Sequence, residues 1–234
     1  MGLADIRREY TLAGLRRKDL DPDPIKQFQQ WFEQALGART SGQVLRFLVR
    51  GYKRLLLIAG IEPTEVNVMT LATADNAGGP SSRIVLLKGV DQRGFIFFSN
   101  YRSQKGRELA ENPNAALTIY WADLERQVCI AGTVSKISQA ESEAYFRTRP
   151  RGSKLGAWAS RQSEPVPDRA ALEAEWRQLE AKYPDDVPMP PYWGGYVLTP
   201  RRIEFWQGRP NRLHDRFCYT RRDDATWQIE RLCP

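Results

Sequence analysis

Basic residues stand beside apolar runs at several points of the sequence, and they are suited to holding an anion. Arg83 and Lys88 flank the apolar centre of RIVLLK, and Lys105 opens a predicted helix after SNYRSQ. Arg149 follows an aromatic pair in YFRTRPRGS. Arginine and lysine form charge-assisted hydrogen bonds with phosphate, and the start of a helix adds backbone donors. These positions therefore predict a binding site for a phosphorylated ligand.

A second basic group alternates in NRLHDR, where Arg212, His214 and Arg216 are each two residues apart. If this segment is a strand, the three side chains share one face, and a charged ligand is their natural counterpart. The alternative is an ordinary solvated strand face, because exposed arginine is common. Trp206, shortly before this group, is by residue type more often part of a core than of a ligand contact.

Histidine and cysteine counts limit the chemistry further. His214 is the single histidine of the 234 residues, which excludes metal sites built from two or three histidines. The three cysteines, Cys129, Cys218 and Cys233, include no CxxC pair. We therefore expect no metal site and no disulfide framework. The sequence also has neither a Walker loop nor a GxGxxG motif.

The net charge is +7, with a pI near 9.4, which favours anionic partners. Because arginine and lysine are dispersed among acidic residues, we expect no nucleic-acid partner. The start, MGLADIRREY, lacks the apolar core of a signal peptide, and the apolar run at 55–61 is too short to span a bilayer. A cytoplasmic protein is the expectation.

Helical signals dominate the first sixty residues. We expect a short basic helix at 3–17 and a second helix from Pro24, capped by Asp23 and stopped at Gly37. A third, basic helix is predicted at 42–60. It favours packing on the body of the protein over membrane contact.

After Pro63 the residue pattern is typical of β-strands. Residues 66–74 and 80–89 flank the turn DNAGG and predict a hairpin. Further strands are expected at 94–100, 115–122, 126–138, 195–206, 214–220 and 226–232. Helices are expected at 103–112, after the capping box of Ser138 and Glu141, around 153–163, and at 168–183.

Most of these strands are neighbours in sequence, which predicts a mainly β protein with added helices (α+β), arranged as an antiparallel barrel. We expect one structural domain, with an N-terminal helical segment at 1–62 and the body at 63–234.

Taken together, the motifs resemble the pyridoxine/pyridoxamine 5′-phosphate oxidase family. They include RREY, RIVLLKG, FFSNYRSQKGRELAENP, LERQV, YFRTRPRGSKLGAWASRQS, WGGY, IEFWQG, NRLHDR and ERLCP, in order along nearly the whole chain. The resemblance implies an FMN-binding split β-barrel and a homodimer with FMN at the subunit interface. It also implies oxidation of pyridoxine or pyridoxamine 5′-phosphate to pyridoxal 5′-phosphate, with hydride transfer to FMN and O₂ reduced to H₂O₂.

The resemblance assigns residues to these ligands. For FMN it implies Arg83, Ile84, Val85, Leu86, Leu87, Lys88, Phe98, Ser99, Gln104, Lys105, Gln127, Gln162, Ser163, Trp206 and Arg216. For the substrate it implies Lys88, Tyr145, Arg149, Ser153, Arg212, Leu213 and His214, with Arg7 and Tyr10 from the N-terminal segment. Arg212 and His214 match the pair placed at the substrate ring, which makes them the expected catalytic residues.

Two departures from the family pattern are visible. Gln104 stands where the family commonly has an arginine, which removes one cation from the predicted phosphate site. The stretch around 39–61 does not resemble the family and looks like an insertion. Two alternative functions remain open at this point: another FMN-dependent split-barrel oxidoreductase, or a protein that binds pyridoxal 5′-phosphate or FMN without catalysis.

Overall fold

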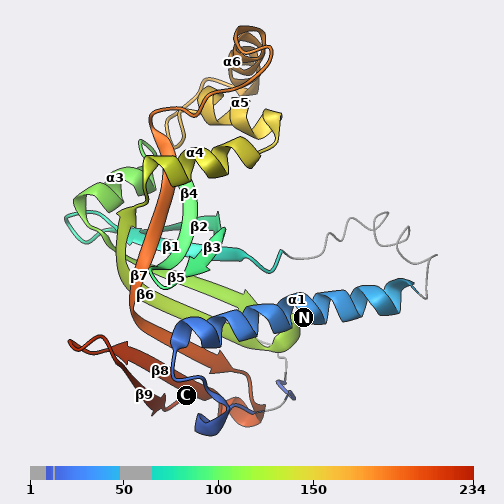
Figure 1. The fold of residues 1–234 in the computed structure, drawn as a ribbon, viewed down its shortest axis with the longest axis vertical. Coiled ribbons are helices and arrows are strands. Elements are labelled where there is room, and N and C mark those ends of the chain that lie inside the picture. Colours follow the sequence, from blue (N-terminus) through green and yellow to red (C-terminus); the bar gives the residue numbers. More distant parts are fainter. Residues whose placement is uncertain (1–8, 13, 48–64) are drawn as a thin grey trace. The chain divides into compact units, whose positions relative to one another are not determined.

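The computed structural model describes residues 9–12, 14–47 and 65–234, with residues 39–47 described by their backbone only. The helices are α1 (Pro24–Phe47), α3 (Gln104–Glu111), α4 (Gln139–Thr148), α5 (Arg151–Ala159) and α6 (Arg169–Lys182), with 3₁₀ turns at Arg17–Asp19, Ala122–Leu124 and Pro210–Arg212. The strands are β1 (Val68–Ala74), β2 (Pro80–Leu86), β3 (Gly89–Asp91), β4 (Gly94–Asn100), β5 (Asn114–Trp121), β6 (Arg126–Lys136), β7 (Trp193–Gln207), β8 (Asp215–Arg221) and β9 (Trp227–Leu232) (Figure 1).

Within the described residues the strands pair in the order β2-β1-β5-β6-β7-β4-β3, and β8 pairs with both β7 and β9. The printed registers of β3 with β4, β4 with β7, β7 with β8 and β8 with β9 are all antiparallel. Sequence neighbours therefore pair, as the hairpin signals predicted, and the fold is the expected curled, split-barrel type of sheet with added helices.

The chain forms two compact units that interleave in sequence. The central unit comprises residues 71–116 and 132–199. The terminal unit comprises the described residues up to Thr70, with 117–131 and 200–234. Helix α1 thus belongs to the same unit as the C-terminal strands. The expected boundary at 62/63 lies outside the described residues, and the division into 1–62 and 63–234 stays a prediction.

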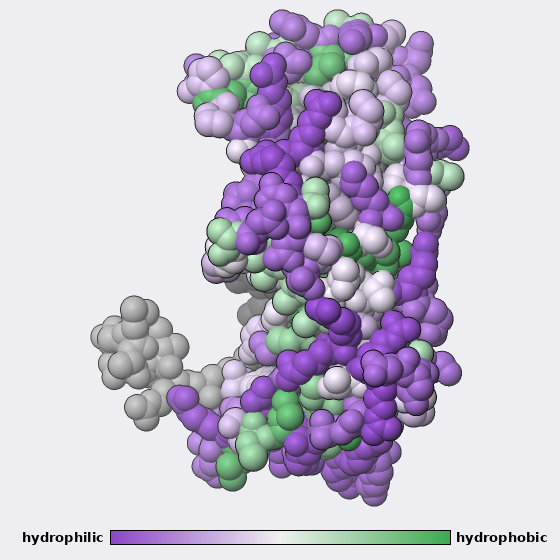
Figure 2. Space-filling model, turned by 90° about the vertical axis from the view of Figure 1, so that its left-hand side faces the viewer, coloured by the Kyte–Doolittle hydropathy of each residue, from purple (hydrophilic) through white to green (hydrophobic). Residues whose placement is uncertain are grey.

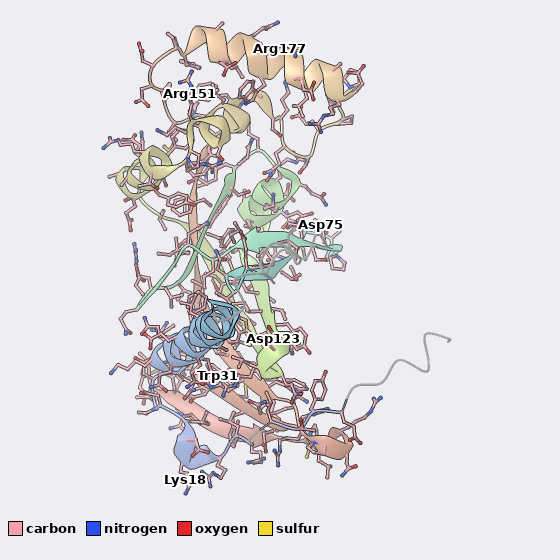
Figure 3. The ribbon with its side chains drawn as sticks, turned by 90° about the vertical axis from the view of Figure 1, so that its right-hand side faces the viewer. Lys18, Trp31, Asp75, Asp123, Arg151 and Arg177 are labelled. Atoms are coloured by element: carbon pink, nitrogen blue, oxygen red, sulfur yellow. The ribbon has the colours of Figure 1, made fainter. Side chains whose placement is uncertain are left out.

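The terminal unit is built around aromatic residues of α1, β7 and β8. The ring centroids of Trp31 and Phe205 are 5.1 Å apart, and Phe205 lies 5.4 Å from Tyr219 (Figure 3 labels Trp31). These three side chains are at most 2 % exposed. Asp23 caps α1 as predicted, because its Oδ1 accepts a hydrogen bond from the Ile25 amide at 2.8 Å.

Two N-terminal predictions are wrong. Helix α1 continues through Gly37 to Phe47, so Gly37 does not end it. Gly37 has no left-handed φ, and a glycine inside a helix costs only about 1 kcal/mol relative to alanine. The described residues between 9 and 16 are not helical, which contradicts the helix expected at 3–17. Of the helix expected at 42–60, residues 42–47 are part of α1 and the rest lies outside the described residues.

Strand β4 and helices α3 and α4 organise the central unit. Phe95 and Phe97 of β4 are fully buried, and β4 pairs with β7 so that Phe98 faces Gly195. Helix α4 begins with the predicted capping box, in which Ser138 Oγ accepts from the Glu141 amide. Helix α5 extends the expected turn around 153–163 backward to Arg151.

Hydrophilic side chains predominate on the face that Figure 2 shows, and hydrophobic residues gather there only in small patches. This surface agrees with a mean hydropathy of −0.55. Among the described residues, no helix combines the length and apolar character that crossing a membrane requires.

The two glycines of WGGY lie where β7 is too closely packed for a Cβ. A Cβ on Gly194 would collide with the hydroxyl of Tyr101, and one on Gly195 would approach Ile137 and Phe98. Gly195 also donates its amide hydrogen bond to Ser142 Oγ at 3.1 Å. The glycines therefore let α4 and the Tyr101 turn lie directly against the strand.

We predict that Gly194→Ala lowers the free energy of unfolding by about 1–3 kcal/mol, because the added methyl overpacks this contact. Urea denaturation of both proteins measures the difference. Gly152→Ala is the matched control, since a Cβ at Gly152 meets nothing within 4 Å. Equal stability of Gly194→Ala and the parent protein would contradict the packing argument.

Candidate functional site

A cavity of about 370 Å³ lies in the central unit, between sheet and helices. Strands β2, β4 and β7, the start of α3, and the segment from the end of α4 through α5 supply its walls. The lining residues are Ile84, Val85, Phe98, Ser99, Asn100, Lys105, Arg149, Ser153, Gly156, Ala157, Ser160, Gln162 and Trp193. Eight of the residues that the sequence assigned to ligands are thus brought to one cavity, including Gln162 from the loop after α5.

Lys105 is a buried cation at the wall of this cavity. Ser103 caps α3, and Lys105 is its second residue, only 6 % exposed. Its Nζ donates to Gln162 Oε1 at 3.2 Å and to Ser103 Oγ at 3.3 Å. Burial, and then the charge of Arg83, lower the pKa of Lys105 to about 8, against a smaller opposing effect of Glu108. An anion in the cavity would restore the charged form of this side chain.

A network of two hydroxyls and one carboxylate holds the guanidinium of Arg83. Its guanidinium donates to the hydroxyls of Thr73 and Ser81 and forms an ion pair with Glu108, with 3.3 Å between Nη2 and Oε2. Gln104 does not line the cavity, because its amide donates to the other oxygen of Glu108 at 2.8 Å. The residue that replaces the family's arginine is therefore engaged by Glu108.

An aromatic layer forms another wall of the cavity. The ring of Phe98 stacks on Tyr145 at 3.9 Å and on Trp193 at 5.4 Å between centroids, with interplanar angles of 19° and 13°. The guanidinium of Arg149 lies 4.7 Å from the centre of the Trp193 ring. Tyr145 is on α4 and Arg149 is its C-cap residue with an extended backbone, and both meet the same aromatic layer.

Arg149 is the second cation of the cavity wall, and its hydrogen bonding is incomplete. Its Nη2 donates to the Ser153 carbonyl at 3.0 Å, while its buried Nε has no partner among the described residues. Burial lowers the pKa of Arg149. A buried donor without an acceptor is costly, so an anion bound beside Arg149 would be stabilised.

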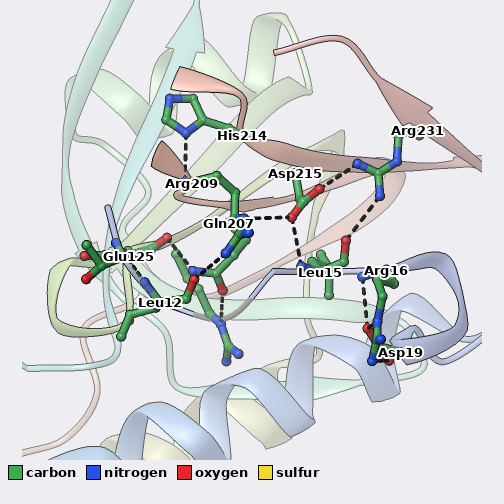
Figure 4. Close-up of polar contacts among 12 residues, drawn as sticks. Leu12, Leu15, Arg16, Asp19, Glu125, Gln207, Arg209, His214, Asp215 and Arg231 are labelled. Carbon is green, nitrogen blue, oxygen red and sulfur yellow. Dashed lines mark hydrogen bonds and ion pairs between the residues drawn. The ribbon is translucent and has the colours of Figure 1, made fainter. Parts of the chain in front are cut away.

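The terminal unit contains a smaller cluster around His214. The ring of His214 lies 4.7 Å from Trp206 and 5.7 Å from Tyr10 between centroids. The Arg209 amide donates to His214 Nδ1 at 3.1 Å (Figure 4). Neutral His214 therefore carries its proton on Nε2 and presents a hydrogen-bond donor there. Burial and the nearby charge of Arg212 lower its pKa below 6.5.

The N-terminal segment is attached to this cluster by two carboxylates. Glu125 accepts the amides of Thr11 and Leu12 at 3.0 and 3.2 Å, and Asp215 accepts the Leu15 amide at 2.9 Å (Figure 4). These bonds explain why the described residues between 9 and 16 are extended rather than helical. They also hold Tyr10 at the rings of Trp206 and His214.

The prediction that Arg212, His214 and Arg216 share one strand face is wrong. Strand β8 begins only at Asp215, and Arg212 lies in a 3₁₀ turn. Asn211 and Arg212 have φ of 56° and 59°, and such left-handed residues break the alternation of a strand. Arg216 is on β8, where its Nε forms an ion pair of 2.7 Å with Glu204.

Other predicted residues are placed as follows. Leu87 is buried, Leu86 is half-buried, and Lys88 is exposed and follows β2. Ser163 is exposed with φ of 76°, Leu213 is 69 % exposed, and Gln127 donates to Cys129 Sγ at 3.3 Å. Arg7 lies outside the described residues. Arg151, labelled in Figure 3, is structural, since it donates to the carbonyls of Tyr183 and Asp185.

Several residues of the site were missed from the sequence. Trp193 and Asn100 line the cavity. Glu108 forms an ion pair with Arg83, and Glu204 forms one with Arg216. The aromatic residue ahead of two glycines was a usable signal for Trp193. Nothing local marks Glu108, because it lies 25 residues from Arg83 in sequence.

The curled antiparallel sheet places the protein in the split-barrel class of folds, with a cationic, aromatic-walled cavity in its central unit. Residues 61–183 match the pyridoxamine 5′-phosphate oxidase family, and residues 193–234 match the C-terminal dimerisation region of pyridoxine 5′-phosphate oxidase. The chain belongs to the pyridoxine/pyridoxamine 5′-phosphate oxidase family, as the sequence motifs predicted.

Curated relatives support this over the full length. The pyridoxine/pyridoxamine 5′-phosphate oxidase of Paraburkholderia phymatum is 53 % identical over 232 residues, covering 99 % of both chains. A Ralstonia nicotianae protein, pyridoxine/pyridoxamine 5′-phosphate oxidase 1, has the same identity and coverage. Because the match includes nearly all of both chains, the stretch at 39–61 adds no length relative to these relatives.

Solved structures give the same fold. PhzG from Burkholderia lata, in complex with tetrahydrophenazine-1-carboxylic acid, is 30 % identical with a TM-score of 0.81, over 97 % of this chain and all of that one. A pyridoxamine 5′-phosphate oxidase-related, FMN-binding protein from Nostoc punctiforme has a TM-score of 0.60 at 20 % identity, over 82 % of this chain and 96 % of its own.

Because His214 is the single histidine of the sequence, the pKa and the tautomer of its ring can be measured without overlap from other histidines. We predict that the pKa of His214 lies below 6.5, because burial and then the charge of Arg212 disfavour the imidazolium. Its neutral form should be protonated on Nε2, because the Arg209 amide occupies Nδ1. Two-bond ¹⁵N–¹H correlation spectra of labelled protein report both properties. Arg212→Ala should raise the pKa toward its ordinary value. A proton on Nδ1 in the neutral ring would contradict the structure.

Proposed function

We propose that this protein binds FMN and oxidises pyridoxine 5′-phosphate or pyridoxamine 5′-phosphate to pyridoxal 5′-phosphate. The observation that carries the proposal is a pair of cations, buried Lys105 and half-buried Arg149, that line one cavity together with the aromatic rings of Phe98 and Trp193. Family membership supplies the reaction class. When bound, the flavin would accept the hydride from the substrate and transfer the electrons to O₂, forming H₂O₂.

The residues of the cavity fit the phosphate of FMN. Lys105 lies in the first turn of α3, where helix amides and the lysine together favour an anion. Arg83 contributes a second positive charge close enough to lower the pKa of Lys105. Ser99 and Gln162, already linked by a hydrogen bond of 3.4 Å, offer polar groups to the ligand.

Arg149 and its neighbours suit the phosphate of the substrate. The unpaired Nε of Arg149 would gain an acceptor, and Ser153 lines the cavity one turn further along the chain. Tyr145 and the exposed Lys88 complete the predicted set. Binding a remote phosphate in this way orients the reacting carbon without taking part in the chemistry.

His214 and Arg212 would act on the ring of the substrate. His214 presents Nε2–H as a donor for a ring oxygen, and Arg212 supplies a planar cation able to cover the ring. These two residues belong to the terminal unit, as do the predicted flavin contacts Gln127, Trp206 and Arg216. The proposal therefore includes a homodimer with FMN at the subunit interface, supported by the match of 193–234 to a dimerisation region. A cytoplasmic location stays a prediction.

One alternative is favoured by a specific observation. The PhzG structure contains tetrahydrophenazine-1-carboxylic acid, so a related fold binds a ring acid without phosphate. The unpaired Arg149 Nε favours an anion in this cavity but does not by itself distinguish phosphate from carboxylate. Oxidase assays with the phosphorylated vitamers and with tetrahydrophenazine-1-carboxylic acid separate the two functions.

FMN affinity should depend on the protonation of Lys105. The phosphate prefers charged lysine, whose pKa is about 8 without ligand. We expect affinity to be constant near pH 7 and to fall, by at most about tenfold per pH unit, as pH rises above this pKa. Fluorescence titration of apoprotein measures it.

Lys105→Met should bind FMN weakly with little pH dependence over the same range. Riboflavin, which lacks the phosphate, is the ligand control and should show no such fall in the parent protein. A pH-independent FMN affinity in the parent protein would remove Lys105 from the phosphate site.

Substrate variants should separate phosphate binding from ring chemistry. Arg149→Ala should mainly raise KM for pyridoxine 5′-phosphate, because its contact is similar in ground and transition states. Arg212→Ala should lower kcat/KM about tenfold or more with FMN still bound. Steady-state oxidase kinetics on FMN-saturated protein measure both.

Arg147→Ala is the matched control, because Arg147 is exposed on α4 and forms a surface ion pair with Glu143, at 3.6 Å. It should keep parental kinetics. Absence of vitamer oxidation by FMN-loaded parent protein would reject the proposed reaction, and parental kcat/KM in Arg212→Ala would remove that residue from the substrate site.

A further inference from the structure

Glu108 is a buried carboxylate to which the proposed reaction gives no role. It is 8 % exposed, and both of its oxygens are engaged. Oε2 accepts from Thr73 Oγ1, from Ser81 Oγ at 2.7 Å and from Arg83 Nη2 at 3.3 Å, while Oε1 accepts from Gln104 at 2.8 Å. Burial raises the pKa of Glu108, but these hydrogen bonds outweigh it and lower the pKa to about 2. Glu108 is therefore an anion at neutral pH.

The two hydroxyls connect this anion to Arg83 in a defined direction. A hydroxyl has one hydrogen, and Thr73 and Ser81 each donate theirs to Glu108. Only lone pairs then remain to face the guanidinium, and Arg83 donates Nη1 to Thr73 and Nη2 to Ser81. The carboxylate thus orients both hydroxyls as acceptors, and the two acceptors fix the plane of the guanidinium.

The neutral side chain at position 104 completes this arrangement. Gln104 lies one helical turn before Glu108 and donates to Oε1, the oxygen to which neither hydroxyl donates. An arginine at 104 would compete with Arg83 for the carboxylate. With glutamine there, Arg83 is the arginine that Glu108 holds within the described part of the chain.

We propose that Glu108 is a positioning residue for the cofactor phosphate. Through Thr73 and Ser81 it holds Arg83 beside Lys105, in the orientation that phosphate binding requires. The inference rests on the proposed function, in which Arg83 and Lys105 bind the phosphate of FMN.

The test compares FMN with riboflavin in titrations of apoprotein. Glu108→Gln should weaken FMN binding about tenfold and leave riboflavin binding unchanged, because only FMN carries the phosphate. Simple electrostatics predicts the opposite sign, since removing a negative charge near an anion site favours the anion. In an Arg83→Ala background, Glu108→Gln should cause no further loss.

A second pair of variants leaves the charges unchanged. Thr73→Val and Ser81→Ala each remove one orienting hydroxyl, and each should weaken FMN binding in the Arg83 protein but not in the Arg83→Ala background. Glu111→Gln is the matched control, because Glu111 is exposed at the end of the same helix. It should leave FMN affinity unchanged.

The outcomes separate this inference from the function on which it rests. If Arg83→Ala weakens FMN binding but Glu108→Gln leaves it unchanged or tightens it, the positioning role is overturned and the phosphate site stands. Equal weakening of FMN and riboflavin in Glu108→Gln would also overturn it, as general damage. If Arg83→Ala itself has no effect, the proposed phosphate site fails, and the inference fails with it.

Discussion

The burial of positive charge beside a cavity is the constraint on which the site depends. Lys105 is buried, Arg149 is half-buried with its Nε inaccessible to water, and neither meets a carboxylate directly in the described contacts. Such cations are tolerated only where neighbouring dipoles, partial ion pairs or a ligand compensate for lost hydration. The hydroxyls, the Gln162 amide and the Trp193 ring supply part of this compensation. The part of the hydration cost that these groups do not offset would be recovered when an anion binds.

The surrounding fold is arranged to keep those groups in place. Gly194 and Gly195 let α4 approach β7, which brings Tyr145 and Arg149 to the same aromatic layer as Phe98. The cap at Ser103 fixes the first turn of α3 and hence Lys105. In the terminal unit, Glu204 engages Arg216, and the Arg209 amide sets the tautomer of His214. In the last three cases a polar contact, rather than side-chain type alone, determines which atom the side chain presents.

Sequence motifs predicted those parts of the structure in which the hydrogen-bonded residues are close together in sequence. The caps at Asp23 and Ser138 and the hairpin at 66–89 lie within a few residues of their partners, and all were predictable. The segment before residue 17 was not, because its amides bond to Glu125 and Asp215, more than a hundred residues away. The turn at Arg212 was missed because no glycine marks its left-handed residues. Most cavity residues came from family resemblance, whereas the network around Glu108 required coordinates.

The attachment of the N-terminal segment has a consequence for how its sequence is able to vary. Thr11, Leu12 and Leu15 are held through main-chain amides, which every residue except proline provides. The contacts of Glu125 and Asp215 therefore depend on the spacing of the backbone amides and not on the identity of the side chains. Substitutions at the exposed Thr11 and Leu12 would be tolerated in large number, whereas Leu15 is also constrained by its buried side chain. A single deletion between Leu12 and Leu15 would shift the register and withdraw the ring of Tyr10 from His214.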